Sequence, residues 1–353
     1  MTRRLLCFVL LWGLLPVSGQ LQAQFGPAQR FVPRASAQVE AGAPGGVSGQ
    51  LLRLEESLDA MGSTYTITLY GYSEDRMEAA VEAAFNEVRR LDRMLSNYRP
   101  DAELAGVNRL AAQRPVKVTP ELFDLLWQCR EYSRESEGAF DITVGPLMRV
   151  WGFFKGTGRL PGREDVAKAL RKVGYRNVIL DRETRTVRFA QPGVELDPGG
   201  IGKGYAVDRM VDVLKDNGIT SALVSAGGSS IYALGTPNNN GKGWEVKIRD
   251  PKDNRRTLKD VYLKNQSMST SGSYEKFFRA QGRIYSHIMD PRTGYPARGV
   301  LSVSVIAPTT LASEGWTKPY FILGRQWAAK HKPGDFRVYI CEDKAEQPCA
   351  WLQ

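Results

Sequence analysis

The sequence predicts an α+β fold, with mixed or antiparallel sheets flanked by helices, and three observations support this prediction. β-Prone segments occur close together, and two of them surround a polar turn in NVILDRETRTVRF, which is typical of a hairpin. Longer segments with apolar residues at helical spacing lie between the strands. Strand and helix do not alternate regularly, so the repeated βαβ units of a parallel sheet are not expected.

The amino-terminal half is expected to contain one clear strand and two long helices. The segment 64–70, TYTITLY, is strongly β-forming and alternates in polarity, whereas residues 74–95 carry apolar side chains at helical spacing. Thr119 and Pro120 suit the cap and the first position of a helix that ends at Gly138.

The carboxyl-terminal half is expected to be richer in strands. The hairpin at 177–189 leads to a helix that follows a glycine-rich segment and stops at Gly218. Four further segments are each expected to be strands: 221–235, 244–250, 261–272 and 301–308. A helix is expected within 314–330, where Pro319 is tolerated only near the first turn.

The bulk composition fits a globular protein with no affinity for nucleic acid. The 353 residues, 42% of them hydrophobic, suffice for one large domain or two smaller ones. The net charge of +10 is spread along the chain, and no basic run with interleaved aromatic residues occurs.

The amino terminus has the order of a secretory signal. Arg3 and Arg4 precede an apolar run too short for a comfortable membrane span, and small residues follow it. We expect a signal peptide at 1–23, a flexible leader rich in Gly, Pro and Ala at 24–50, and a folded part at 51–353. An uncleaved membrane anchor is the alternative.

Export makes the cysteines informative. Cys341 and Cys349 flank a short polar loop and could form a disulfide in an oxidising compartment. Cys129 lies in a segment of helical periodicity and is expected to be a buried thiol. No pattern of cysteine and histidine indicates zinc.

The segment ELDPGGIGKGYAVD, from Glu195 to Asp208, places four glycines around Lys203. A Walker A loop would need glycine where Asp197 stands, and the spacing of a dinucleotide fingerprint also fails. Glycines nevertheless let backbone N–H groups approach a ligand, and the start of the following helix favours an anion. The segment therefore indicates a phosphate-binding turn, with an ordinary tight turn before a helix as the alternative.

Six blocks, in order across nearly the whole folded part, resemble the ApbE family, the FAD:protein FMN transferases. They are MGSTYTITLY, LSNYRPDAELAGVN, GAFDITVGPL, LDPGGIGKGYAVD, ALVSAGGSSIYALG, and STSGSYEKFF with YSHIMDPRTGYPA. The resemblance implies a single large catalytic domain with T-fold-like halves and a flavin site. It places these residues at FAD: Met61, Tyr98, Ala139, Phe140, Asp141, Asp197, Lys203 and Ile288. His287, in a strand before an Asp-Pro turn, is implied as the candidate base.

The resemblance also implies Mg²⁺, held by a backbone carbonyl of the glycine turn and by an Asp followed four residues later by Thr. Gly200, or its neighbour Gly202, would supply the carbonyl. This chain departs from the Asp–Thr pattern of the metal ligands. Glu314 is found where the family has Asp, and Lys318 is found where the family has Thr. Thr317 lies one residue before the expected threonine position. Ser229 likewise stands where the family usually has Asp. Glutamate can still bind Mg²⁺ through oxygen, whereas a lysine there would supply positive charge itself or repel the ion.

The function implied is Mg²⁺-dependent transfer of FMN from FAD to a Thr or Ser side chain of an acceptor protein, with release of AMP. The acceptor would belong to membrane-associated, flavin-dependent electron transfer. Export would place the enzyme in the periplasm or at the outer face of the inner membrane, in proximity to a membrane surface. Two alternatives remain open: hydrolysis of FAD to FMN and AMP, and a non-catalytic periplasmic protein that binds flavin.

Overall fold

The structure is a computed structural model that describes residues 50–353 except 157, 238–240, 254 and 344–347. The expected signal peptide and nearly all of the expected leader therefore lie outside the described residues. None of the described helices has the length and apolar character needed to cross a membrane.

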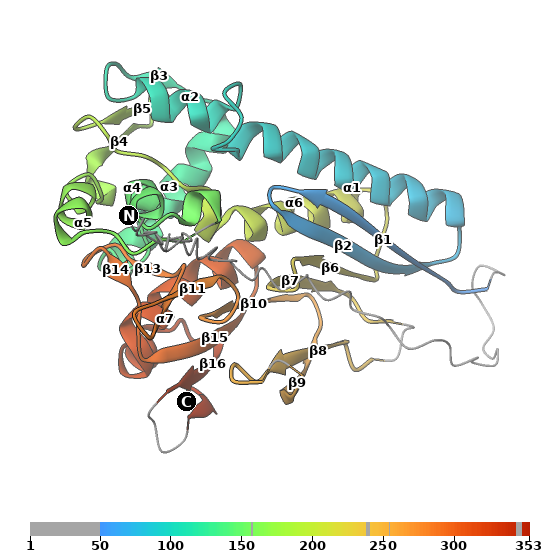
Figure 1. Ribbon diagram of the computed structural model, residues 1–353. Coiled ribbons are helices and arrows are strands. Elements are labelled where there is room, and N and C mark those ends of the chain that lie inside the picture. Colours follow the sequence, from blue (N-terminus) through green and yellow to red (C-terminus); the bar gives the residue numbers. More distant parts are fainter. Residues whose placement is uncertain (1–49, 157, 238–240, 254, 344–347) are drawn as a thin grey trace, which may run out of the picture.

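An eight-stranded sheet forms the centre of the fold (Figure 1). Every strand pairing within it is antiparallel, and the strands follow one another across the sheet in the order β1-β2-β6-β7-β10-β15-β16-β17. Their bounds are β1 (Leu52–Ala60), β2 (Ser63–Gly71), β6 (Ala222–Ala226), β7 (Ser230–Leu234), β10 (Gln266–Gly272), β15 (Val300–Ala307), β16 (Arg337–Glu342) and β17 (Cys349–Trp351). The expected α+β class is confirmed.

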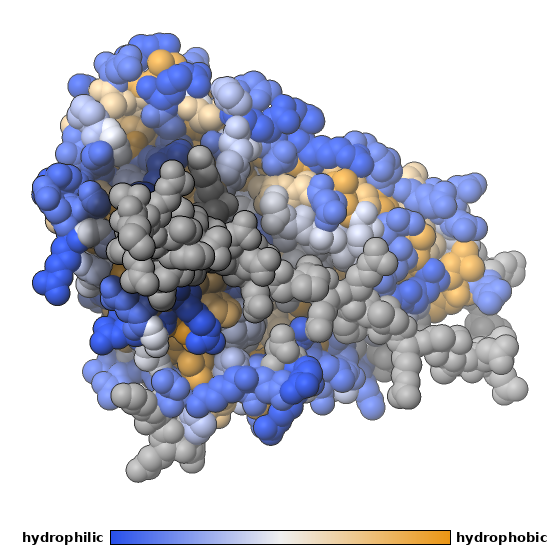
Figure 2. All heavy atoms as spheres, viewed as in Figure 1, coloured by the Kyte–Doolittle hydropathy of each residue, from blue (hydrophilic) through white to orange (hydrophobic). Residues whose placement is uncertain are grey.

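Three long helices cover one face of this sheet: α1 (Glu74–Leu95), α6 (Gly202–Asp216) and α7 (Thr310–His331). Helices α1 and α6 lie side by side in Figure 1, and α7 packs on β10 and β15. The apolar stripes that predicted α1 and α6 form the main core, which includes the fully buried Leu91, Val207 and Met210. The face seen in Figure 2 is mostly hydrophilic, with apolar atoms gathered where α1 and β2 lie.

A hairpin of β8 (Trp244–Arg249) and β9 (Thr257–Leu263) pairs outside the main sheet, and together with β7, β10, β15 and β16 it encloses a second apolar cluster. Cys341 belongs to this cluster and forms a disulfide with Cys349 on the neighbouring strand. Cys129 is a fully buried free thiol, as the sequence predicted.

The remaining elements lie outside the main sheet and its three covering helices. They are α2 (Glu103–Leu110), β3 (Val116–Lys117), α3 (Pro120–Glu135), η1 (Ile142–Val144), α4 (Gly145–Val150), η2 (Phe153–Lys155), α5 (Arg163–Leu170), η3 (Tyr175–Asn177), β4 (Val178–Asp181), β5 (Thr186–Phe189), η4 (Pro198–Gly200), β11 (Phe277–Ala280), β12 (Arg283–Ser286), β13 (Met289–Asp290) and β14 (Tyr295–Pro296). The fully buried Trp151 packs against the β11–β12 hairpin through Phe278 and Tyr285.

Most elements expected from periodicity and turn residues are confirmed. Helix α1 has the expected bounds, and Thr119 caps α3 by accepting a hydrogen bond from the Leu122 N–H at 3.3 Å. The segments 221–235 and 261–272, each expected to be one strand, instead contain two. Gly227 and Gly228, both with positive φ, turn β6 into β7, and Asn265, at φ 50°, separates β9 from β10.

The expectation for Pro319 was wrong, because α7 begins at Thr310 and the proline lies in the interior of the helix. Thr309 caps this earlier start by accepting a hydrogen bond from the Ala312 N–H at 3.3 Å. The helix contains a second irregularity at Gly324, where φ 78° and ψ −178° interrupt the helical backbone.

Helices α6 and α7 each carry a carboxylate that accepts hydrogen bonds from backbone N–H groups in the first turn of the other helix. The Asp208 carboxylate on α6 accepts the N–H groups of Thr310 at 2.7 Å and Leu311 at 2.8 Å, at the start of α7. The Glu314 carboxylate on α7 accepts the N–H of Gly204, in the first turn of α6. Carboxylates at helix amino termini are stabilising, by about 0.3–1 kcal/mol each when exposed and by more when buried. This reciprocal capping fixes the crossing of the two helices.

The same crossing predicts that Gly204→Ala is destabilising. A methyl group on Gly204 would lie 2.6 Å from the Thr310 carbonyl oxygen and 2.8 Å from Glu314 Oε2, so the helices would have to separate. We expect a loss of about 1–3 kcal/mol in the free energy of unfolding, measured by thermal denaturation. Gly106→Ala in α2 is the matched control, because the nearest atom lies 3.9 Å away. The control should be neutral or stabilising, and an equal response of both variants would contradict the close crossing.

Candidate active site

The glycine-rich segment follows an irregular stretch after β5 and leads through the η4 turn into α6. The backbone of Leu196 is fixed by Asn108, which accepts its N–H at 2.8 Å and donates to its carbonyl at 3.0 Å. Asn97 donates to the same carbonyl at 3.0 Å. Asp197 then caps the η4 turn by accepting the Gly199 N–H at 2.8 Å, and α6 starts at Gly202. These contacts present the turn as a rigid unit.

Asp197 lies among charged groups of three different segments. Burial raises the pKa of its carboxyl group, and the neighbouring Glu195 carboxylate adds to this rise. The positive charges of Arg149 and Lys276 oppose it. Within the described residues, the Gly199 N–H is the single hydrogen bond to this carboxylate, at Oδ1. The carboxylate can therefore accept further hydrogen bonds from a ligand.

Tyr98 forms an exposed aromatic wall beside Asp197, with 70% of its surface accessible. Its hydroxyl donates to the Phe154 carbonyl at 2.8 Å, and the two rings lie 4.6 Å apart. Arg149 stacks on the Phe154 ring at 3.8 Å and binds the Glu195 carboxylate through two hydrogen bonds of 2.6 Å. Exposed, braced rings of this kind suit the stacking of a flat heterocycle.

Two lysines come together at the start of α6. Lys203 does not extend into solvent, because its ammonium group donates to the Ser229 hydroxyl. Lys318, on α7, lies beside the turn: a methyl group on Gly200 would be 3.8 Å from Lys318 Cε. Burial lowers the pKa of Lys318 to about 8, a shift that the Glu314 carboxylate opposes and the Lys203 charge increases. The Lys318 group therefore remains predominantly charged at neutral pH.

His287 follows strand β12 and is held at one ring nitrogen. Its Nδ1 lies 3.1 Å from the Lys276 carbonyl oxygen, which fixes Nδ1 as the protonated nitrogen and leaves Nε2 unprotonated. Burial lowers the pKa of His287 to about 3. Three nearby lysines act in the same direction: Lys276, Lys203 and Lys318. The histidine and the two lysines at the start of α6 thus belong to one electrostatic cluster.

Met61 also reaches the start of α6, although it comes from the β1–β2 turn. Its backbone has φ 50°, and its sulfur accepts a hydrogen bond from the Tyr65 hydroxyl at 3.3 Å. A methyl group on Gly202 would lie 3.5 Å from Met61 Cε. The structure therefore brings Met61 to the glycine turn.

The predicted residues at 139–141 and Ile288 are buried. Phe140 lies under the turn, 3.5 Å from the position of a methyl group on Gly200. The Asp141 carboxylate is occupied by the protein itself, accepting from the Thr143 N–H and hydroxyl at 2.8 and 2.6 Å and from the Tyr175 N–H at 2.6 Å. Asp141 therefore holds the backbone of neighbouring segments in place, and its contact with a ligand stays a prediction.

Among the residues expected to hold Mg²⁺, Glu314 and Thr317 have side-chain oxygens that already contact other groups of the protein. Glu314 Oε2 accepts the Gly204 N–H, and Oε1 lies 3.6 Å from the Lys318 ammonium. The Thr317 hydroxyl donates to the Glu314 carbonyl at 2.7 Å and accepts from the Ser271 hydroxyl at 2.8 Å. Over the part of the chain that is described, no group of three or more His, Cys, Asp or Glu side chains could hold a metal ion. This arrangement does not fit a divalent cation.

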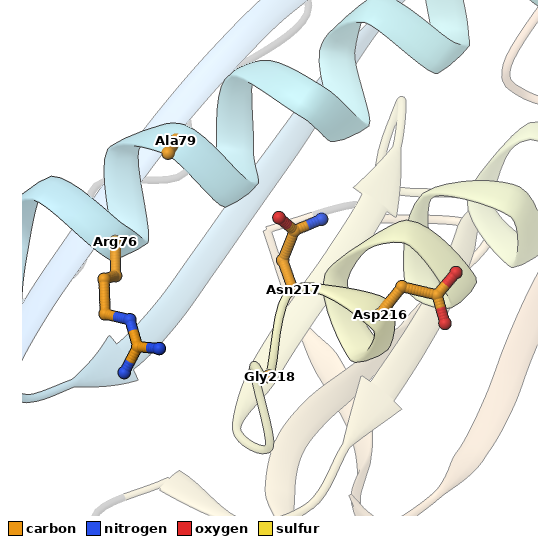
Figure 3. Close-up of a pocket in the computed structure, with 5 residues that line it drawn as sticks. All are labelled: Arg76, Ala79, Asp216, Asn217 and Gly218. Carbon is orange, nitrogen blue, oxygen red and sulfur yellow. The ribbon is translucent and has the colours of Figure 1, made fainter.

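The surface hollow in Figure 3 lies away from this cluster. It is lined by Arg76 and Ala79 of α1 and by 216–218 at the end of α6. The lysine cluster lies at the opposite end of α6, about 20 Å away at 1.5 Å per helical residue. The hollow is therefore not part of the candidate active site.

Sequence reasoning missed three charged residues of the site: Arg149, Glu195 as its partner, and Lys276. Arg149 lies in a short helix with no motif around it, and Lys276 lies in the STSGSYEKFF block, whose hydroxyl residues are the more obvious ligand-binding candidates. The role of Arg149 depends on Glu195, 46 residues away, and the role of Lys276 depends on its contact with His287 across a hairpin, and periodicity reveals neither contact.

Comparisons with known proteins show the family of this chain. A family model described as the ApbE family matches residues 61–339. A FAD:protein FMN transferase of Klebsiella pneumoniae is 32% identical over 266 residues, covering 75% of this chain and 80% of that protein. One of Treponema pallidum is 33% identical over 293 residues, covering 78% and 81%.

Solved structures show the same fold. The ApbE protein of Thermotoga maritima superimposes with a TM-score of 0.76 at 29% identity, covering 84% of this chain and 98% of that one. The apo form of the flavinyl transferase ApbE of Pseudomonas stutzeri gives a TM-score of 0.74 at 29% identity, covering 86% and 95%. The protein is therefore an enzyme of the ApbE family.

Proposed function

We propose that this protein transfers FMN from FAD to the hydroxyl group of a Thr or Ser in an acceptor protein and releases AMP. The names of the relatives support the reaction class, since they are FAD:protein FMN transferases. The observation that carries the proposal is the cluster at the start of α6, where Lys203 and Lys318 lie near His287, whose pKa is lowered mainly by burial and further by the nearby lysines. Positive charge beside a candidate base is what transfer of a nucleotidyl group requires.

The step balances without a redox partner. The acceptor oxygen forms a bond to the phosphorus of the FMN half, and the anhydride bond of the pyrophosphate breaks. The hydroxyl proton passes to the base, and the electron pair of the broken bond leaves on the phosphate of AMP. The chain's task is to align the hydroxyl, bind the pyrophosphate charge and accept one proton.

His287 is the group placed to accept that proton. The Lys276 carbonyl holds Nδ1, so Nε2 is the nitrogen that would act as base. The lowered pKa keeps the ring neutral in the free enzyme. The negative charge of bound FAD would raise the pKa of the ring towards the range useful for proton transfer.

The flavin and adenosine parts of FAD would be recognised by residues on the exposed side of the site. Tyr98 offers a flat, accessible ring, and the Asp197 carboxylate can accept hydrogen bonds from a flavin, an adenine or a ribose. Met61 closes the site from the β1–β2 turn. For Mg²⁺, which the resemblance implies, the described residues offer no fitting set of donors, and the proposed step uses side chains alone.

We also propose that the enzyme acts outside the cytoplasm, on an outward-facing domain of a membrane-associated, flavin-dependent electron-transfer protein. The order of residues 1–23 supports export, and the Cys341–Cys349 disulfide is of a kind that persists in oxidising compartments.

The function is tested by incubating the purified protein with FAD and a candidate acceptor. Transfer would give a fluorescent acceptor band together with AMP. AMP and free FMN without a labelled acceptor would instead indicate hydrolysis, and FAD binding without AMP would indicate a flavin-binding protein.

His287→Ala is expected to reduce the transfer rate by about 100-fold or more while leaving FAD affinity nearly intact, because the base is lost and the binding groups remain. The measurement is AMP release at saturating FAD, alongside titration of flavin fluorescence. His331→Ala is the control, since this second histidine stacks on Trp327 near the end of α7. Equal losses of rate and affinity would make His287 a binding residue instead.

The pH dependence follows from the lowered pKa of His287. A histidine of ordinary pKa loses its base form as the pH falls through about 6.5. With a folded-state pKa of about 3, the base form persists at acid pH. We therefore expect kcat/KM for FAD, which reports groups of the free enzyme, to stay within about two-fold between pH 7.5 and 5.5. An acid limb centred near pH 6.5 would contradict the assignment.

Asp197→Ala is expected to act on binding. Loss of the carboxylate should weaken FAD affinity by about 10-fold or more, the scale of a hydrogen bond to a charged group, with a smaller effect on the rate at saturation. Flavin fluorescence titration measures the affinity. Asp212→Ala, on the exposed side of α6, is the control and should bind FAD as the wild type does. Unchanged affinity in Asp197→Ala would remove this residue from the binding site.

A further inference from the structure

The Lys318 side chain lies between Glu314 and the glycine turn. Its ammonium group donates to the Glu314 carbonyl at 3.0 Å and lies 3.6 Å from Glu314 Oε1. Its Cε lies 3.8 Å from the position of a methyl group on Gly200. One positively charged side chain therefore lies beside both the carboxylate of α7 and the turn, the two parts that a bound ion is expected to bridge.

A divalent ion at Glu314 would have to share this space with Lys318. At a metal–oxygen distance of about 2 Å from Oε1, the ion would lie within about 6 Å of the ammonium nitrogen. The other carboxylate oxygen, Oε2, accepts a hydrogen bond from the Gly204 N–H, and the Thr317 hydroxyl accepts one from the Ser271 hydroxyl. Like charges at this separation in a buried site repel strongly.

The charge that a metal would bring is present in the side chains. Lys203 donates to the neutral Ser229 hydroxyl. The Glu275 carboxylate interacts with both Lys203 and Lys318 and offsets part of their charge. Ser229 and Lys318 are also the two departures from the family pattern that change the charge, the first by removing a negative unit and the second by adding a positive one. Relative to that pattern, the two departures change the local charge by as much as one divalent cation would.

We propose that Lys318, assisted by Lys203, supplies at the FAD pyrophosphate the positive charge that Mg²⁺ is expected to supply in this family, so that the enzyme works without a divalent metal. This inference rests on the proposed function. The two ammonium groups bind the pyrophosphate oxygens and stabilise the negative charge that gathers on the leaving phosphate of AMP as the anhydride bond breaks. Glu314 orients Lys318 and does not act as a metal ligand.

The first test compares rates of FMN transfer with Mg²⁺ and with excess EDTA. The wild type should retain its rate within about two-fold in EDTA, whereas Lys318→Met, which keeps the apolar stem, should lose about 100-fold or more. Lys168→Met is the control, because this exposed lysine pairs with Glu164 on α5 and should behave as the wild type does. Loss of wild-type activity in EDTA and its recovery with Mg²⁺ would overturn the proposal.

The second test measures metal binding directly. Mn²⁺ is titrated into the enzyme–FAD complex and free Mn²⁺ is followed by electron paramagnetic resonance, with FAD alone as the reference. The wild type should bind no more Mn²⁺ than FAD does, and the double variant Glu314→Asp with Lys318→Thr should bind it stoichiometrically and need Mg²⁺ for transfer. Stoichiometric Mn²⁺ binding by the wild-type complex would overturn the proposal.

Measurements of ligand affinity test the role of Lys318 independently of the proposed transfer reaction. Lys318→Met should weaken FAD binding by about 10-fold or more and leave the affinity for riboflavin, which has no phosphate, unchanged. Equal affinities of the variant and wild type for FAD would overturn the role of Lys318. Absence of FMN transfer in all conditions would remove the proposed function, and the Mn²⁺ and affinity measurements would still decide what occupies the site. If Lys318→Met does not fold, the wild-type EDTA and Mn²⁺ experiments decide alone.

Discussion

The crossing of α6 and α7 is the constraint on which the site depends. Asp208 accepts the first N–H groups of α7, and Glu314 accepts an N–H in the first turn of α6, so neither helix can shift without exposing a buried carboxylate. Gly204 allows this approach because a side chain there would meet the Thr310 carbonyl. The crossing brings Lys203, one residue before the contact on α6, close to Lys318, one turn after Glu314 on α7.

The site also requires that the segments around the glycine turn are held in place. Asn97 and Asn108 hold Leu196, and Asp141 ties the segment before α4 to the loop that contains Tyr175. None of these three side chains needs to touch a ligand to matter, since electrostatic stabilisation depends on donors that are already in place. These three side chains bond mainly to backbone groups, which is how a protein keeps polar groups inside without losing stability.

The sequence predicted the parts of the fold that depend on local chemistry. The apolar stripe of α1, the cap at Thr119 and the polar turn of the β4–β5 hairpin are each visible within a few residues. The sequence did not predict the features that depend on contacts between residues far apart in the chain. Helix α7 starts early because Asp208, about a hundred residues away, accepts its first N–H groups, and Arg149 gains its role from Glu195. The residue types of the site were predicted largely by resemblance, but the engagement of Glu314 by Lys318 and Gly204 could be seen only in three dimensions.

The order of the strands has a consequence for how the chain can assemble. Across the main sheet, β1, β2, β6, β7, β10, β15, β16 and β17 appear in the order in which they are synthesised. Each new strand is therefore added to the outer edge of those already made, and no strand has to enter between two that are paired. A polypeptide that is synthesised amino end first can extend such a sheet stepwise, burying each edge as the next strand arrives. The disulfide joins the last two strands to be made, β16 and β17.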